Sequence, residues 1–322
     1  MDIRFVTADE VAASVSPARA VEAIRAALCG GLDPAGDPAR TSVPVASGQL
    51  LLMPSEFGDV VGTKIATVAP ANPDTGLPRI QAVYVVIDGA TLTPSVLIDG
   101  TALTTLRTPA VSVAAVTDHL RARTGPLRVA VFGAGPQGLG HVATLRDVLG
   151  DTVIGEVTYI VREPARAATP TGASAGDVVA AGSHAATEAL RGADIVVTAT
   201  GSAVPVFDST QIASDAVVLA VGSHEPDRRE LDTDLMSRAQ VVVEDRATAL
   251  RESGDIVMAV DEGTLTPDDL LPMAAVVTGS APLTDERPVV FKSSGMSWED
   301  AVVAATVAQA TADLNSPTEP VD

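Results

Sequence analysis

A glycine-rich segment in the middle of the chain has a spacing that indicates chemistry. Gly133, Gly135 and Gly138 fit the pattern G-x-G-x-x-G, with an apolar run at 127–132 before them and a helix-like run after them. Glycines at this spacing permit a tight turn and let the backbone approach a pyrophosphate, whose charge is received by the N-terminus of the following helix. In this context the pattern predicts a dinucleotide-binding site.

The end of the next apolar run bears on which dinucleotide is bound. Residues 157–161 are followed by Arg162 and Glu163. In such sites an acidic side chain at this position favours NAD, whereas a cation accommodates the additional phosphate of NADP. Arg162 therefore favours NADP(H), and Glu163, one residue further along, leaves NAD(H) open.

Lysine is scarce in this chain, so each lysine is a candidate for a special role. Only Lys64 and Lys292 are lysines among 21 basic residues, and Lys64 lies between apolar stretches. A lysine in a pocket would therefore be unusual against this background, and the alternative is a compositional bias that favours arginine over lysine.

The elements that must position these residues follow two different patterns. Residues 8–29 and 107–122 have helical spacing of apolar residues, and the short apolar runs between 41 and 106 predict consecutive antiparallel strands. After residue 127, apolar runs alternate with helical segments, which predicts a parallel sheet with crossover helices. The predicted strands lie at 127–132, 157–161, 193–199 and 216–221, and the predicted helices at 136–149 and from Ser297 through Leu314.

Length and composition exclude several classes of protein. The 322 residues suggest two domains, and 46% hydrophobic with 19% charged residues indicates a folded protein. A net charge of −20 makes nucleic acid and membrane surfaces poor partners. One cysteine and four scattered histidines predict neither a disulfide nor a metal site. Since the N-terminal residues do not resemble a signal peptide, we expect a cytoplasmic protein.

Six short segments resemble the ornithine cyclodeaminase/mu-crystallin family, in family order and over nearly the whole chain. They are Arg40-Thr41, Gly62-Thr63-Lys64, Leu106-Arg107-Thr108-Pro109-Ala110, Gly133-Ala134-Gly135-Pro136-Gln137, Val221 through Leu231, and Phe291-Lys292-Ser293-Ser294-Gly295. The resemblance implies an α/β fold that combines a Rossmann dinucleotide-binding domain with a discontinuous α+β substrate-binding and dimerisation domain. We expect the Rossmann domain at 116–295, the second domain at 1–115 and 296–322, and a homodimer.

The resemblance also implies roles for individual residues. Arg40 and Arg107 would bind the carboxylate of a small amino-acid-like substrate, Lys64 would orient it or relay a proton, and Ser294 would face it. A planar guanidinium can hold a carboxylate through two hydrogen bonds. The expected cofactor-binding residues are Arg107, Gly133, Gly135, Pro136, Gln137, Gly138, Arg162, Thr200, Val221, Gly222, Arg228 and Ser293.

The sequence departs from the family pattern at one position that matters for the reaction. Cyclodeaminases of this family carry an acidic residue where this chain has His224, and Glu225 could replace it only by a shift of one residue. A neutral imidazole can still exchange protons near pH 7, so we expect Lys64 and His224 as the catalytic groups.

This departure favours one of the activities that the resemblance implies and leaves two alternatives open. The favoured activity is an NAD(P)H-dependent reductase of cyclic ketimines such as Δ1-pyrroline-2-carboxylate or, in reverse, a dehydrogenase of an L-amino acid such as alanine. One alternative is an ornithine cyclodeaminase, a lyase that converts ornithine to proline and ammonia with catalytic NAD. The other is a non-enzymatic, NADP(H)-dependent binder of a small ligand.

Overall fold

A computed structural model describes residues 3–313 and divides into two compact units. Unit 1 contains residues 3–27, 36–107 and 296–313, and unit 2 contains residues 28–35 and 108–295. The division falls inside a helix at residue 107, whereas the sequence analysis placed the domain boundary after residue 115. Residues 1–2 and 314–322 of the expected second domain lie outside the described residues. They include Leu314, the predicted last residue of the C-terminal helix.

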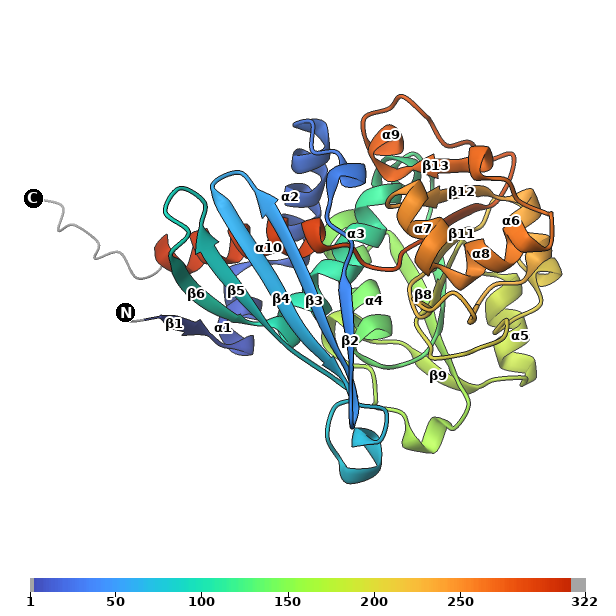
Figure 1. Cartoon of the computed structure of the whole chain (residues 1–322). Coiled ribbons are helices and arrows are strands. Elements are labelled where there is room, and N and C mark those ends of the chain that lie inside the picture. Colours follow the sequence, from blue (N-terminus) through green and yellow to red (C-terminus); the bar gives the residue numbers. More distant parts are fainter. Residues whose placement is uncertain (1–2, 314–322) are drawn as a thin grey trace, which may run out of the picture. The chain divides into compact units, whose positions relative to one another are not determined.

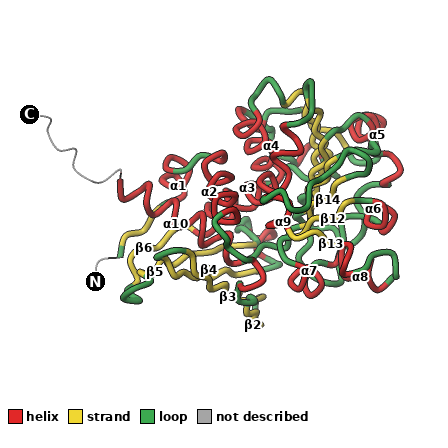
Figure 2. Tube along the Cα trace, turned by 90° about the horizontal axis from the view of Figure 1, so that it is seen from above, coloured by secondary structure: helices red, strands yellow, loops and turns green. Residues whose placement is uncertain are grey.

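Unit 1 is a six-stranded sheet with helices on one face (Figures 1 and 2). The sheet order is β1-β6-β5-β4-β3-β2, with antiparallel pairing throughout except for the parallel pair of β1 and β6. Its elements are β1 (Arg4–Val6), α1 (Ala8–Ser14), α2 (Pro17–Cys29), η1 (Pro34–Gly36), β2 (Thr41–Val45), β3 (Gly48–Phe57), β4 (Val60–Val68), η2 (Asn72–Thr75), β5 (Ile80–Asp88), β6 (Pro94–Asp99) and α10 (Ser297–Asp313).

The pleat of β4 sends alternate side chains toward the helices. Gly62, Lys64 and Ala66 are buried on the face that packs against α10, while the residues between them are partly exposed. Lys64 pairs across the sheet with Tyr84 of β5, which is fully buried. A Cβ atom on Gly62 would collide with the hydroxyl of Tyr84, so the glycine before Lys64 leaves room for that ring.

Unit 2 contains an eight-stranded sheet in which every pair of strands is parallel (Figure 1). The sheet order is β13-β12-β14-β11-β10-β7-β8-β9. Its elements are α3 (Gly100–Arg121, which begins in unit 1), β7 (Leu127–Phe132), α4 (Pro136–Leu149), β8 (Ile154–Val161), η3 (Pro164–Arg166), η4 (Gly172–Ser174), β9 (Asp177–Ala180), α5 (His184–Arg191), β10 (Ile195–Thr198), η5 (Ser209–Gln211), β11 (Val217–Ala220), α6 (Thr233–Arg238), β12 (Gln240–Val243), α7 (Arg246–Glu252), α8 (Gly254–Asp261), η6 (Pro267–Asp269), β13 (Leu270–Pro272), α9 (Met273–Val277) and β14 (Val289–Lys292).

Helices cover both faces of this parallel sheet, which is the Rossmann arrangement (Figure 2). Residues such as Ala130 and Phe132 pack with α5, α6, α7 and α8, whereas Val131 points to the opposite face, on which α4 packs. The strands β10, β11, β12 and β14 are buried along their whole length. The predicted parallel sheet with crossover helices is therefore confirmed.

Two predicted helix boundaries are wrong. Residues 8–29 form two helices rather than one, because Pro17 disfavours helical backbone at Ser16 and starts a new helix itself. Helix α3 begins at Gly100 rather than at 107, so the predicted strand region ends at Asp99. Pro109, which belongs to the predicted segment 107–122, lies inside α3.

The other elements agree with the sequence analysis. Strand β7 and helix α4 have the predicted bounds, and α10 begins at the predicted Ser297. Strands β8, β10 and β11 lie at the predicted places with shifts of one to three residues at their ends. Within residues 3–313, no helix is long and apolar enough to cross a membrane.

Candidate active site

The glycine segment of unit 2 forms the turn from β7 into α4. Gly133 has a φ of +105°, and a Cβ atom there would lie 2.6 Å from the carbonyl oxygen of Ala199. A Cβ atom on Gly138 would collide with the carbonyl oxygen of Gly133, so this glycine brings the helix close to the strand. Gly135 differs from both, because a Cβ atom there would meet nothing within 4 Å.

The surroundings of Gly135 fit a bound dinucleotide. Gly135 caps the N-terminus of α4 and Pro136 occupies the first turn, so the positive end of the helix faces the open space over this glycine. The absence of a side chain allows the phosphates to approach the backbone. NAD(P) would be held here, at the point between β7 and β10 where the strand order reverses, which is where such sheets bind nucleotides.

A buried carboxylate, that of Glu230, draws together the loops that follow β10 and β11. Glu230 is fully buried and accepts hydrogen bonds from the backbone N–H groups of Thr200 and Gly222, each at 2.7 Å. The hydroxyls of Thr198 and Thr200 also donate to it, at 2.9 and 2.6 Å. Two of the expected cofactor-binding residues, Thr200 and Gly222, are therefore held side by side.

A second buried group holds the loop that contains His224. Asp255 accepts hydrogen bonds from the backbone N–H groups of Glu230 and Leu231, both at 2.8 Å. Its other oxygen lies 3.3 Å from Nζ of Lys292, which donates to the carbonyl oxygen of Ser223 at 2.5 Å. Lys292, the second lysine of the chain, is thus a structural group that fixes this loop.

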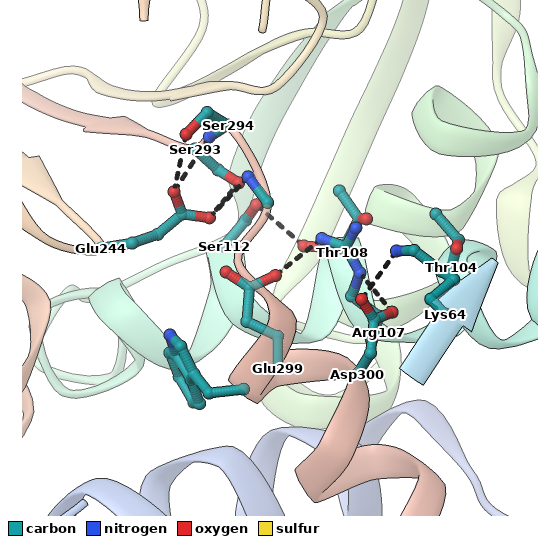
Figure 3. A network of polar contacts seen from close by, with 12 residues as sticks. Lys64, Thr104, Arg107, Thr108, Ser112, Glu244, Ser293, Ser294, Glu299 and Asp300 are labelled. Atoms are coloured by element: carbon teal, nitrogen blue, oxygen red, sulfur yellow. Dashed lines mark hydrogen bonds and ion pairs between the residues drawn. The ribbon is translucent and has the colours of Figure 1, made fainter. Parts of the chain in front are cut away.

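The segment Ser293-Ser294-Gly295 is held by Glu244 (Figure 3). The hydroxyl of Ser293 donates to the buried Glu244 carboxylate at 2.6 Å, and the backbone N–H groups of Ser294 and Gly295 donate at 2.9 Å. The Ser294 hydroxyl also points to this carboxylate, at 3.3 Å. Both serines therefore have a structural task in addition to any contact with a ligand.

Unit 1 contains a buried cluster of two cations and two carboxylates (Figure 3). Nζ of Lys64 donates to Oδ2 of Asp300 at 2.6 Å, and Nε of Arg107 donates to Oδ1 of the same residue at 3.1 Å. Nη1 of Arg107 also donates to Oε2 of Glu299 at 2.6 Å. The side chains of Lys64 and Arg107 are 4% and 7% exposed, and those of Glu299 and Asp300 are fully buried. The sequence analysis assigned both cations to the substrate, and Asp300 brings them together.

Burial makes the Lys64 amine easier to deprotonate. Loss of hydration lowers the pKa of Lys64 to about 8, and the charge of Arg107 acts in the same direction. The carboxylates of Asp300 and Glu299 oppose this change. An amine with this pKa can both give and accept a proton close to neutral pH.

The remaining predicted residues lie at the ends of strands or in loops. Arg40 is half-buried and directly precedes β2; if the register of Thr41 with Leu52 were continued by one residue, Arg40 would face Met53, the partner of Lys64. Arg162 is exposed directly after β8. His224 and Val221 are half-buried, as is Gln137 in the first turn of α4. Arg228 donates to the carbonyl oxygen of Gly201 at 2.6 Å and lies 3.3 Å from Glu225.

The sequence analysis missed the carboxylates that organise these groups. Glu230, Glu244, Asp255, Glu299 and Asp300 are all buried, yet none was a candidate. Glu244 follows the apolar run 241–243, and an acidic residue at the end of a buried strand was a usable signal. Glu299 and Asp300 lie in the first turn of α10, and in the sequence alone acidic residues at this place indicate only a helix start.

Comparisons with known proteins agree with this arrangement. The sequence model of the ornithine cyclodeaminase/mu-crystallin family matches residues 3–314. Ketimine reductase mu-crystallin of Rattus norvegicus is 33% identical over 312 residues, which cover 94% of this chain and 96% of that protein. The Δ1-pyrroline-2-carboxylate reductase of Bacillus cereus is 33% identical over 286 residues and 83% of each chain. A solved archaeal alanine dehydrogenase dimer with bound NAD has a TM-score of 0.83 at 25% identity, over 99% of this chain and 98% of that one.

The open space over Gly135 gives a test of the dinucleotide site. We expect Gly135→Ala to weaken NAD(P)H binding on the order of tenfold or more, because the methyl group would occupy space that the phosphates need. Its melting temperature should stay unchanged, because the methyl group meets nothing in the protein. Titration of NAD(P)H fluorescence and a thermal melt measure the two effects. Gly138→Ala is the matched comparison and should lower the melting temperature. Unchanged NAD(P)H affinity in Gly135→Ala would contradict this assignment.

Proposed function

Since the chain belongs to the ornithine cyclodeaminase/mu-crystallin family, we propose that it is an NAD(P)H-dependent oxidoreductase that reduces cyclic ketimines of the Δ1-pyrroline-2-carboxylate type. In reverse, it would oxidise an L-amino acid such as alanine. The observation that carries the proposal is the buried pair of Lys64 and Arg107 on Asp300, in a chain that also has a Rossmann site. The pair combines a fixed cation with an amine able to transfer a proton.

In this reaction the protein's own side chains would bind the substrate and supply a proton. Arg107, with Arg40, would hold the substrate carboxylate, and Lys64 would deliver a proton to the imine nitrogen. When bound, the nicotinamide supplies the hydride that the imine carbon receives. The double bond between carbon and nitrogen becomes a single bond, and the amine leaves with one new C–H and one new N–H bond.

Replacing Lys64 tests the proposal directly. We expect wild-type protein to oxidise NADPH or NADH in the presence of Δ1-pyrroline-2-carboxylate or Δ1-piperideine-2-carboxylate. Lys64→Met should lower kcat about 10²-fold or more, because it removes the proton donor. The loss of nicotinamide absorbance measures the rate, and the exposed Arg191→Met is the control. Ammonia release from ornithine without net oxidation of the cofactor would contradict the proposal.

We further propose that the protein prefers NADP(H) over NAD(H). The support for this preference is the cation of Arg162, exposed directly after β8, the second strand of the nucleotide-binding half. The carboxylate of the adjacent Glu163 lies 3.5 Å from Arg166.

We expect Arg162→Ala to weaken NADPH binding on the order of tenfold and to leave NADH binding nearly unchanged, because only NADPH carries the additional phosphate. Fluorescence titration with both cofactors measures the two dissociation constants. Arg166→Ala, four residues further along and also exposed, is the matched control. An equal effect of Arg162→Ala on both cofactors would exclude Arg162 as the phosphate-binding residue.

We also propose a cytoplasmic homodimer. The cytoplasmic location rests on the absence of any possible internal disulfide, because the chain has one cysteine. The dimer is supported by the face of the unit 1 sheet opposite α10, here called the open face. It exposes apolar side chains at its edges, with Phe5 51%, Val43 39% and Val45 50% exposed. An apolar face of this kind is typical of an interface, and the archaeal alanine dehydrogenase is a dimer.

Charges on the open face should separate the dimer. We expect Val43→Asp combined with Val45→Asp to convert the protein from dimer to monomer, because two carboxylates would be buried without partners. Size-exclusion chromatography with light scattering measures the mass. Val204→Asp, at a side chain that is 65% exposed in unit 2, is the control and should stay dimeric. A dimer that survives both charges would place the interface elsewhere.

A further inference from the structure

We propose that Asp300 is a positioning residue that holds the Lys64 amine and the Arg107 guanidinium together and keeps Lys64 protonated for transfer to the substrate. The expected effect of Asp300 on turnover rests on the proposed function, whereas its expected effect on the protonation of Lys64 does not.

The geometry of Asp300 suits a bridge between two cations. Each carboxylate oxygen binds a different cation: Oδ2 lies 2.6 Å from Nζ of Lys64, and Oδ1 lies 3.1 Å from Nε of Arg107. The side chain is fully buried in the first turns of α10 and cannot exchange these partners for water. Without Asp300, Lys64 would lose the carboxylate with which it forms an ion pair at 2.6 Å.

Glu299 is a natural comparison, because it shares one role of Asp300 but not the other. It comes from the same turn of α10, is equally buried and binds Arg107 at 2.6 Å. Its influence on the charge of Lys64 is weaker than that of Asp300. If a substitution acts only through Arg107 or through the packing of α10, replacing Glu299 and replacing Asp300 should have similar effects. A change in the protonation of Lys64 should instead result mainly from replacing Asp300.

The groups that face Lys64 determine the sign of the effect. Asp300 and Glu299 come from α10, Arg107 from α3 and Tyr84 from β5. Tyr84 stays neutral, because burial and the nearby carboxylates of Asp300 and Asp37 raise its pKa. Burial and Arg107 lower the pKa of Lys64 to about 8, and Asp300 is the largest opposing influence. Removal of the Asp300 charge must therefore lower the pKa of Lys64 further, so that the proton is lost at lower pH.

The scarcity of lysine makes this protonation directly measurable. Protein grown with carbon-13 at the ε position of lysine gives side-chain signals from Lys64 and Lys292 alone, the two lysines of the sequence. Lys64→Arg assigns the signals by removing one of them. A pH titration of the intact protein by NMR then follows Lys64 without any substrate. We expect its midpoint near pH 8 in the wild type. A midpoint well below pH 7, at which most Lys64 would be unprotonated near neutral pH although Asp300 is present, would overturn the proposal without the need for a variant.

The variants separate the bridge from a general structural effect. Asp300→Asn should shift the titration midpoint of Lys64 to lower pH, and Glu299→Gln should shift it less. The Lys292 signal is the internal control, and its chemical shift at a fixed pH should be the same in the variants as in the wild type, because its partner is Asp255. Equal shifts in the two variants, or no shift in Asp300→Asn, would show that Asp300 has no special role. If Asp300→Asn does not fold, Asp300→Glu keeps the charge and tests whether its position matters.

The pH profile of turnover completes the test. Reduction of the imine needs protonated Lys64, so kcat/KM should fall above pH 8 in the wild type. In Asp300→Asn the fall should begin at lower pH, with a loss on the order of tenfold at pH 8 that is recovered in part at lower pH. If the NMR midpoint shifts and the pH profile does not, Lys64 is held by Asp300 but is not the proton donor, and this part of the proposal is wrong. If no imine is reduced by the wild type, the proposed function fails, while the NMR result still decides the role of Asp300 on Lys64.

Discussion

A charge that is buried without a partner costs several kcal/mol. The arrangement of the buried carboxylates in both units follows from this constraint. Each of the carboxylates of Glu230, Glu244, Asp255 and Asp300 is buried, and each meets donors that lie far away in the sequence. Asp300 and Lys64 are 236 residues apart. A loop that moved away would leave its carboxylate unpaired, so these contacts fix the loops that carry several of the predicted site residues.

The buried carboxylates have two kinds of partners, and the difference has chemical consequences. Glu230 and Glu244 accept hydrogen bonds from backbone N–H groups and from hydroxyls of Thr and Ser, which do not titrate in the physiological range. Their geometry is therefore independent of the protonation of the donors. Asp300 instead binds two cations, one of which is a lysine with a pKa of about 8. The proton chemistry of unit 1 thus depends on an ion pair, whereas Glu230 and Glu244 hold their loops in unit 2 without a cation.

The sequence was sufficient for the glycine turn, whose structure depends on local spacing. The glycine segment gave the bounds of β7 and α4, because turn geometry and helix start are set within a few residues. It was insufficient where a side chain's role depends on a distant partner. Glu299 and Asp300 look like ordinary first-turn residues of a helix until the fold brings Lys64 and Arg107 to them. The start of α3 at Gly100 was missed, and Pro109 lies inside this helix, where packing overrides a local preference.

The choice of lysine at position 64 has a physical reason in a chain where all but two of the 21 basic residues are arginine. A guanidinium there could pair with Asp300, but it would keep its proton at every physiological pH. An ammonium can release its proton, yet burial alone would make it lose that proton too readily. A buried lysine that must deliver a proton near neutral pH therefore needs a carboxylate beside it. On the proposed chemistry, Lys64 and Asp300 form one functional unit, and neither residue would serve the reaction without the other.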